Sequence, residues 1–193
     1  RLGITEADSV DNVKTTVCRV LANGPVASGL RFDFNHWRPM GRDYDVTETI
    51  GIWPGPYAYS NTVTFRRLHG DETAVVGLVN SMTDHKPTEV RVNKDWVVLF
   101  TDDKQSVNKT WWLGLALILP SNDYEGYMVA PQQGSVSKTF LAKLRVRSDT
   151  PLHYFAVAGW RMSDPLFRDS TSFRRYLTNL TDQLAARVKV TVR

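Results

Sequence analysis

The chain has 193 residues, of which 42% are hydrophobic and 23% charged, values that are typical of a folded globular domain and exclude wholesale disorder. The formal net charge is +4, and the basic residues are scattered among acids, whereas a nucleic-acid binder usually concentrates them in one stripe or tail. A single cysteine, Cys18, excludes an internal disulfide and a cysteine-rich metal site, and the apolar runs are too short for a transmembrane helix.

The first third of the chain predicts four strands. Residues 13–21 alternate in polarity and are rich in β-branched side chains, and an Asn-Gly-Pro turn follows them. The next strand places a set of apolar side chains and a final histidine on one face: Val26, Leu30, Phe32, Phe34 and His36. Residues 44–52 and 59–65 complete the set, separated by a Trp-Pro-Gly-Pro turn that no helix crosses. Four strands joined by tight turns predict an antiparallel meander.

The middle of the chain predicts buried strands joined by polar loops. Residues 73–80 and 96–100 are short and apolar, and residues 111–119 are apolar on both faces, so we expect the last of these to lie between two layers. Residues 81–88 and 101–110 are expected to be hydrophilic loops. Residues 120–137 predict a long loop interrupted by a brief extended segment at 127–129.

The last third contains the most apolar strand and the only predicted helix. Residues 140–146 alternate with one polar face, and residues 153–160 (HYFAVAGW) form a nearly unbroken apolar run, which predicts a strand covered on both faces. The helix is indicated by apolar side chains spaced i, i+3, i+4, i+7 and i+11, with Ser170 or Ser172 as its N-cap. Those side chains are Phe173, Tyr176, Leu177, Leu180 and Leu184. Alternating valines at 188–192 predict a final strand.

About ten strands and one late helix predict a mainly β fold. The sequence has no internal repeat and no linker, so we expect residues 1–193 to form a single domain. Long strands that are apolar on both faces favour a large antiparallel two-sheet β-sandwich over a small barrel. The chain opens RLGITEAD, without an initiator methionine or a signal peptide, and we therefore expect an N-terminal portion to be missing.

No strong catalytic motif is present, because the sequence lacks GxSxG, P-loop, dinucleotide-binding and HExxH patterns. The histidines His36, His69, His85 and His153 are not spaced as a metal-binding pair, so neither a metal site nor a cofactor is predicted. His36 and His153 are the strongest functional candidates among them, because each lies at a strand end beside aromatic residues. The alternative for every one of them is a histidine with a structural role.

The residues around the apolar run suggest acid–base chemistry. Lyases on β-rich folds use a Tyr or His base together with a cation that neutralises a uronate, because the proton to be abstracted must first be made acidic. If the protein is an enzyme, we therefore expect lyase or hydrolase chemistry with His153 or Tyr154 as acid/base and Arg161 as the anion partner. The alternative is that the aromatic residues only fill the core.

A second set of residues is predicted to bind substrate through flat aromatic faces and polar groups at strand ends. Trp53 lies between turn residues and is expected to be exposed, whereas core burial is the alternative for the other tryptophans. The predicted substrate-binding residues are His36, Trp37, Arg38, Trp53, His85 and Trp160.

The order of several segments resembles a bacterial domain-of-unknown-function family, number 4861, over nearly the whole chain. The segments are NGPVASGLRFDFNHW, YDVTETIGIWPG, VVGLVN, WWLGLALILP, and PLHYFAVAGW before FRRYL and a terminal VKVTV. Members of that family are encoded with polysaccharide-degrading enzymes. The resemblance implies a secreted or periplasmic supersandwich of the galactose-mutarotase-like type, with carbohydrate as its ligand, and it supplies no catalytic set.

The resulting hypothesis is a carbohydrate-active or carbohydrate-binding domain for plant or algal polysaccharide fragments, with acidic glycans favoured by the basic surface. The alternative, from a different class, is a non-catalytic structural or interaction sandwich that pairs with another chain or with a missing N-terminal half, as an oligomer or a partner domain. An anion- or nucleic-acid-binding module that uses Arg66 and Arg67 is a distant third, and we expect no nucleic-acid partner and no membrane span.

Overall fold

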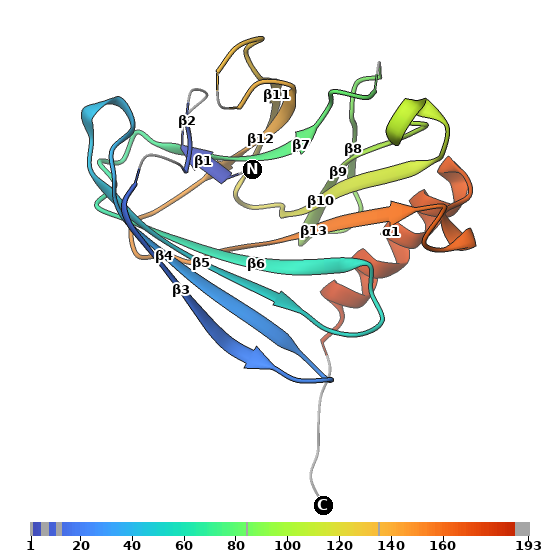
Figure 1. Cartoon of the computed structure of the whole chain (residues 1–193), viewed down its shortest axis with the longest axis horizontal. Helices are drawn as coiled ribbons and strands as arrows, with labels where there is room; N and C mark the ends of the chain where they lie inside the picture. Colours follow the sequence, from blue (N-terminus) through green and yellow to red (C-terminus); the bar gives the residue numbers. More distant parts are fainter. Residues whose placement is uncertain (1, 5–7, 11–12, 84, 135, 188–193) are drawn as a thin grey trace, which may run out of the picture.

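The computed structural model describes residues 2–4, 8–10, 13–83, 85–134 and 136–187, which form a mainly β structure of two antiparallel sheets and one helix (Figure 1). The small sheet consists, in spatial order, of β11 (Tyr124–Val129), β12 (Thr139–Arg145), β7 (Thr73–Val79), β1 (Leu2–Ile4) and β2 (Asp8–Ser9). The large sheet consists of β3 (Val13–Asn23), β4 (Ser28–Trp37), β5 (Tyr44–Ile52), β6 (Ala58–Arg66), β13 (Leu152–Trp160), β10 (Leu113–Pro120), β9 (Trp96–Asp103) and β8 (Thr88–Arg91). The two-sheet sandwich predicted from the sequence is confirmed.

The predicted meander is confirmed as well, because β3, β4, β5 and β6 are consecutive antiparallel neighbours in the large sheet. The short strands β1, β2 and β8 have no counterpart among the predicted strands, and β11 begins at Tyr124, earlier than predicted. The last predicted strand, at 188–192, lies outside the described residues. None of the helices in the described ranges is both long and apolar enough to cross a membrane.

The main core lies between the two sheets and is built from the inward-facing side chains of both. A β-bulge near the end of β4 decides which residue enters it: Phe34 is opposite Val46 and Trp37 is opposite Tyr44, so β4 carries one extra residue there. His36 has a φ of 55° at this bulge. The prediction that His36 ends the apolar face is therefore wrong, and Trp37, only 1% exposed, packs inward instead.

A second core lies on the outer face of the large sheet, where α1 (Ser170–Ala185) packs against β9 and β10. Two strand glycines make this close packing possible. A Cβ atom at Gly114 would lie 2.4 Å from the Phe173 ring, and one at Gly159 would lie 2.6 Å from the Phe167 ring. The middle of strand β13 is thus covered by the small sheet on one face and by Phe167 and α1 on the other. This confirms the strand covered on both faces for residues 154–157, whereas His153, Ala158 and Trp160 are exposed.

The start of α1 differs from the prediction in its capping residue. The N-cap is Asp169, whose carboxylate accepts a hydrogen bond of 2.8 Å from the Ser172 backbone N–H. Ser170 lies inside the first turn, and its hydroxyl donates to the Asp102 carboxylate on β9. The predicted caps, Ser170 and Ser172, are therefore wrong, because the aspartate one position earlier supplies the oxygen that the helix start needs.

The large sheet extends beyond the area that the small sheet covers (Figure 1). Several large apolar or aromatic side chains on its inner face consequently remain more than a third exposed, among them Val20, Leu30, Ile52 and Tyr59. The inner surface of the large sheet thus changes from a closed core to an open surface along β4, β5 and β6.

Candidate functional site

A cleft of about 460 Å³ lies where the small sheet ends over the inner face of the large sheet. Its floor comes from β5, β6, β10 and β13, and its roof from β1, β7 and β12. The volume falls within the range of about 300–1,000 Å³ that is usual for ligand pockets. Most lining side chains are apolar, and a small set is polar: Glu48, Tyr59, Asn61, Thr139 and Tyr154.

The register of three neighbouring strands brings these polar side chains together. Asn61 on β6 is paired with Ile50 on β5 and with Tyr154 on β13. Because side chains two residues apart share a face, Glu48 lies next to Ile50 on that same inner face. In the sequence, Glu48 and Asn61 are polar residues within inward-facing rows that are otherwise apolar. This pattern could have indicated the site, but neither residue is among the predicted site residues.

The Asn61 side chain is buried without a matching partner. Its residue is 2% exposed, and its Nδ2 amide has no hydrogen-bond acceptor in the described part of the chain. A buried donor without an acceptor lowers the stability of the folded protein by roughly 1–3 kcal/mol. Tyr154, beside it on β13, is 4% exposed. The cleft is therefore lined by a residue with a free hydrogen-bond donor, which a ligand oxygen would reach after a shift of the surrounding side chains, because Nδ2 itself is buried.

Burial also raises the cost of negative charge in the cleft. Desolvation raises the pKa of the Glu48 carboxyl. It also raises the pKa values of the Tyr59 and Tyr154 hydroxyls, and the nearby charge of Glu48 raises both further. Among the described residues that line the cleft there is no Lys, Arg or His. The site consequently disfavours buried charge, and its hydroxyl and amide groups both donate and accept hydrogen bonds.

The three residues predicted to be catalytic do not come together. His153 and Tyr154 are consecutive on β13 and therefore point to opposite faces, so only Tyr154 lines the cleft. On the outer face, His153 Nδ1 lies 3.0 Å from the Thr62 hydroxyl, and desolvation lowers the pKa of its imidazole. Arg161 follows the end of β13, with its guanidinium 5.3 Å from the centre of the Trp111 ring.

The residues predicted to bind substrate are dispersed over the molecule. Trp160 shares the inner face with Tyr154 and is 41% exposed. Trp53 was expected to be exposed but packs on the outer face, with its ring centre 6.2 Å from that of Phe155. Trp37 is part of the core, and His85 Nδ1 lies 2.9 Å from an Asp103 carboxylate oxygen.

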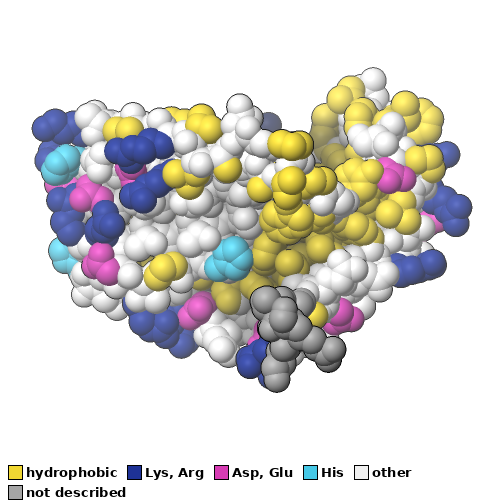
Figure 2. All heavy atoms as spheres, turned by 90° about the horizontal axis from the view of Figure 1, so that it is seen from below, with side chains coloured by type: hydrophobic (Ala, Val, Ile, Leu, Met, Phe, Trp, Pro, Cys, Tyr) yellow, Lys and Arg dark blue, Asp and Glu magenta, His cyan; other side chains and the backbone are white. Residues whose placement is uncertain are grey.

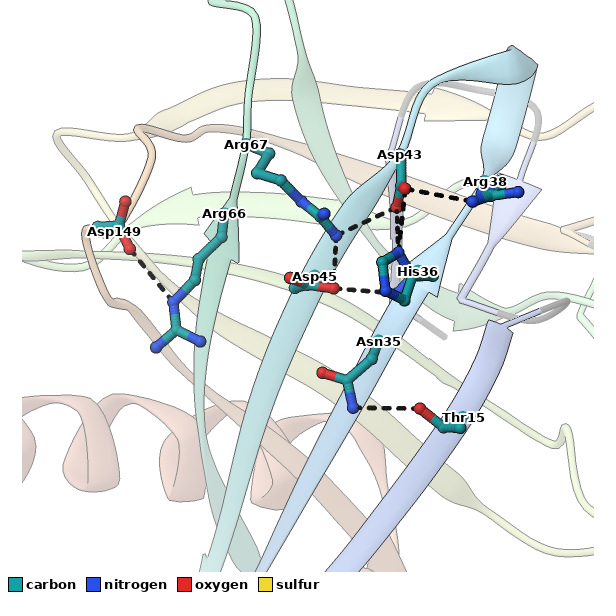
Figure 3. Close-up of polar contacts among 9 residues, drawn as sticks. All are labelled: Thr15, Asn35, His36, Arg38, Asp43, Asp45, Arg66, Arg67 and Asp149. Carbon is teal, nitrogen blue, oxygen red and sulfur yellow. Dashed lines mark hydrogen bonds and ion pairs between the residues drawn. The ribbon is translucent and has the colours of Figure 1, made fainter.

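Two of the predicted residues, His36 and Arg38, do lie together in an edge cluster with Asp43, Asp45 and Arg67 (Figure 3). Asp43 accepts a hydrogen bond from His36 Nδ1 at 3.0 Å and one from Arg67 at 3.1 Å. The hydrogen bond from His36 is the largest cause of the lowered pKa of the Asp43 carboxyl. In Figure 2 charged side chains of both signs gather at the corresponding end of the molecule.

The edge cluster also contains a group of potential metal ligands. One ligand atom each from His36, Asp43 and Asp45 lies within 4.8 Å of the others. The guanidinium of Arg67 already contacts both carboxylates, at 3.1 Å from Asp43 and 2.6 Å from Asp45. Because this cation neutralises the aspartates where a metal ion would bind, the cluster is best explained as a set of mutually satisfied ion pairs.

The comparisons with known proteins agree with the resemblance seen in the sequence. The sequence model of the family described as Domain of unknown function (DUF4861) matches residues 2–190, which is nearly the whole chain. No curated protein matches the chain. The chain therefore belongs to the DUF4861 family.

Proposed function

We propose that this protein binds a carbohydrate in the cleft between its two sheets. The observation that carries the proposal is the buried Asn61 amide, which has no acceptor among the described residues and lines a largely apolar cleft of about 460 Å³. A sugar ring offers what such a cavity requires, since its hydroxyls accept and donate hydrogen bonds while its C–H faces pack on apolar side chains.

Aromatic side chains near the cleft support the same ligand class. Tyr59 lines the cleft and is 43% exposed, and Trp160 lies on the same inner face of the sheet and is 41% exposed. Their flat rings can pack against the apolar faces of sugar rings while their polar atoms stay accessible to water. The inner face would then provide stacking near the opening and hydrogen bonds at the base.

The polar groups of the cleft favour recognition over hydrolysis. Glycoside hydrolysis usually needs two carboxyl groups about 5–10 Å apart across the bond. Among the described lining residues, Glu48 is the one carboxylic acid. The lyase hypothesis requires an anion partner, and Arg161 does not line the cleft where Tyr154 lies. We therefore propose binding as the function of the cleft, and the enzymatic hypothesis stays a prediction.

The wider role follows from the family resemblance. A role beside enzymes that degrade plant or algal polysaccharides, in a secreted or periplasmic protein, is part of the same proposal. A binding domain with this role would hold oligosaccharide fragments through one or two sugar units, because the volume of the cleft limits how much of a chain it encloses.

The proposal is tested by titration calorimetry with a panel of oligosaccharides. Replacement of Asn61 by alanine should weaken binding about fivefold, since a hydrogen bond in a desolvated site contributes on the order of 1 kcal/mol. His153→Ala is the matched control, because it changes the neighbouring strand on the opposite face of the sheet. Equal effects of the two substitutions, or no binding of any oligosaccharide, would contradict the proposal.

A second candidate function, self-association, is favoured by one observation at the other side of the large sheet. In the described ranges β3 is the last strand of that sheet, and its residues after Val13 are all exposed. A long open strand edge readily pairs with another strand. Antiparallel pairing of two copies centred on Cys18 would place Arg19 opposite Val17 and Lys14 opposite Ala22, so no like charges would face each other.

This alternative has a direct test in solution. Light scattering should show a dimer, and mild oxidation should cross-link two copies through Cys18, whose paired backbones would approach within disulfide range. Lysine in place of Val20, which is 66% exposed, should abolish both signals without unfolding the chain. A monomer at all concentrations would contradict the alternative and leave the carbohydrate proposal untouched.

A further inference from the structure

We infer that the cleft selects neutral saccharides over uronic acids and that Glu48 enforces this selection. The inference rests on the proposed carbohydrate-binding function and names its substrate class. It replaces the sequence-based expectation of an acidic glycan, which was drawn from the net charge of the whole chain.

The charge of the lining residues is the first argument. Glu48 is the one acid among the described lining residues, which include no Lys, Arg or His. A uronate carboxylate that entered the cleft would lose water without gaining a cation, and uncompensated burial of an ion costs several kcal/mol. A neutral sugar hydroxyl avoids this cost because the amide, hydroxyl and carboxyl groups of the cleft satisfy it.

The positions of the basic residues are the second argument. On the outer face of the large sheet, Arg19 and Arg31 both form ion pairs with Asp33. Arg67 pairs with Asp43 and Asp45 in the edge cluster. These arginines are therefore paired with acids outside the cleft and do not supply a uronate-binding cation there.

The surroundings of Glu48 explain how one residue sets the selectivity. Asn61 lies near it on the next strand, and its carboxyl has no hydrogen bond or ion pair in the part of the chain that the structure describes. Among the described lining residues, the titratable groups facing it are Tyr59 on β6 and Tyr154 on β13, and those of β1, β7, β10 and β12 carry none. The positive charge of the N-terminus opposes the effect of burial on the pKa of Glu48. Glu48 is thus positioned to donate to a ligand oxygen when protonated and to accept from a ligand hydroxyl when ionised.

This dual role predicts different pH behaviour for the two ligand classes. A neutral sugar can hydrogen-bond to either form of Glu48, so its affinity should change little between pH 5 and pH 8. A uronate can approach only the protonated form, because two like charges would otherwise meet in a desolvated site. Uronate binding should therefore require uptake of a proton and should strengthen as the pH falls.

The experiment compares matched ligand pairs that differ in the carboxylate, such as galactan and galacturonan oligosaccharides of equal length. Calorimetry at pH 7.5 should show the neutral member binding more tightly, by roughly two hundredfold or more if the like charges lie about 5 Å apart at an effective dielectric constant of about 20. Glu48→Gln should reduce this preference at least tenfold, mainly by raising the affinity for the uronate. Glu125→Gln is the control, because it removes an equal charge on β11 outside the cleft.

The outcomes separate this inference from the proposed function. Binding of the uronate with equal or higher affinity at pH 7.5 would overturn the inference and leave carbohydrate binding intact. Failure of both ligand classes to bind the folded wild-type protein would overturn the proposed function itself. An unchanged preference in a folded Glu48→Gln variant would show that Glu48 does not set the selectivity.

Discussion

Two carboxyl groups, the buried Glu72 and the half-buried Glu48, differ in how completely the fold satisfies them. Glu72 precedes β7 and accepts hydrogen bonds from the Tyr44 hydroxyl at 2.9 Å, from the His69 N–H at 2.9 Å and from the Gly70 N–H at 2.8 Å. Glu48 has no such partner within the described residues and lines a cleft. The acceptors of Glu72 are occupied by the fold, whereas those of Glu48 remain available to a ligand.

The pKa shifts of the two groups express the same difference. Burial would raise the pKa of Glu72, but the hydrogen bonds from His69, Gly70 and Tyr44 outweigh it, so the pKa is lowered. Glu48 receives no such hydrogen bonds from the described residues, and burial raises the pKa of its carboxyl. A carboxylate that the fold stabilises in its charged form has a structural role, and one that the fold destabilises is a candidate for binding.

The largest expected effect is the removal of Glu72. Glu72→Ala should lower the free energy of unfolding by about 3 kcal/mol, because it leaves several buried donors without an acceptor. Urea denaturation at pH 7 measures the change. Because the folded pKa of Glu72 is lowered, its stabilisation is present above the unfolded value of 4.5 and is lost as the pH falls through the folded pKa. A loss below 0.5 kcal/mol, on the order of a surface substitution, would contradict the contrast with Glu48.

Asn61 should show the opposite pattern. Replacing it with leucine removes a buried amide that has no acceptor in the described ranges, so the free energy of unfolding should stay unchanged or rise by about 1 kcal/mol. The same variant should lose oligosaccharide binding. Thermal unfolding and calorimetry on the same sample test both expectations, and a large loss of stability would show that the amide has a partner in the native protein.

Glu48→Gln should stabilise the protein at neutral pH by a smaller amount. The folded pKa of Glu48 is raised above the unfolded value of 4.5, so the wild type loses stability as the pH rises from that value through the folded pKa. Glutamine does not titrate, and the difference between the two proteins should therefore disappear below about pH 4. Urea unfolding across pH 4–8 measures it. A stabilisation that is independent of pH would disprove the assigned cause.

The edge cluster should give the smallest effect. Arg67 is 42% exposed at its side chain, and exposed ion pairs contribute about 0.2–1 kcal/mol each. Arg67→Gln should therefore lower stability by less than about 1 kcal/mol and leave oligosaccharide binding unchanged. Addition of 0.5 M salt should reduce the difference between the variant and the wild type, because salt screens exposed charges. Loss of binding in this variant would show that oligosaccharides bind at the edge cluster and not in the cleft.

Several elements could be predicted because their cause is local. The period-two alternation of β3 to β6, the turns between them and the apolar spacing of α1 are properties of neighbouring residues, and the structure confirms them. The unbroken run of β13 likewise indicated two covering layers, which are the small sheet and the helical segment. Strand alternation by itself also implies that His153 and Tyr154 face opposite sides of the sheet.

The site itself depended on contacts between distant parts of the chain. Alternation assigns Glu48 and Asn61 to the inner face of the large sheet, but only the position of β1, β7 and β12 decides whether that part of the face is core, cleft or open surface. Similarly, the bulge at His36 depends on pairing between β4 and β5, and it points the Trp37 side chain toward the core. The sequence by itself thus determined the strands and their faces, whereas the tertiary structure decided which polar groups remain without partners, because burial is set by the layer that packs on top.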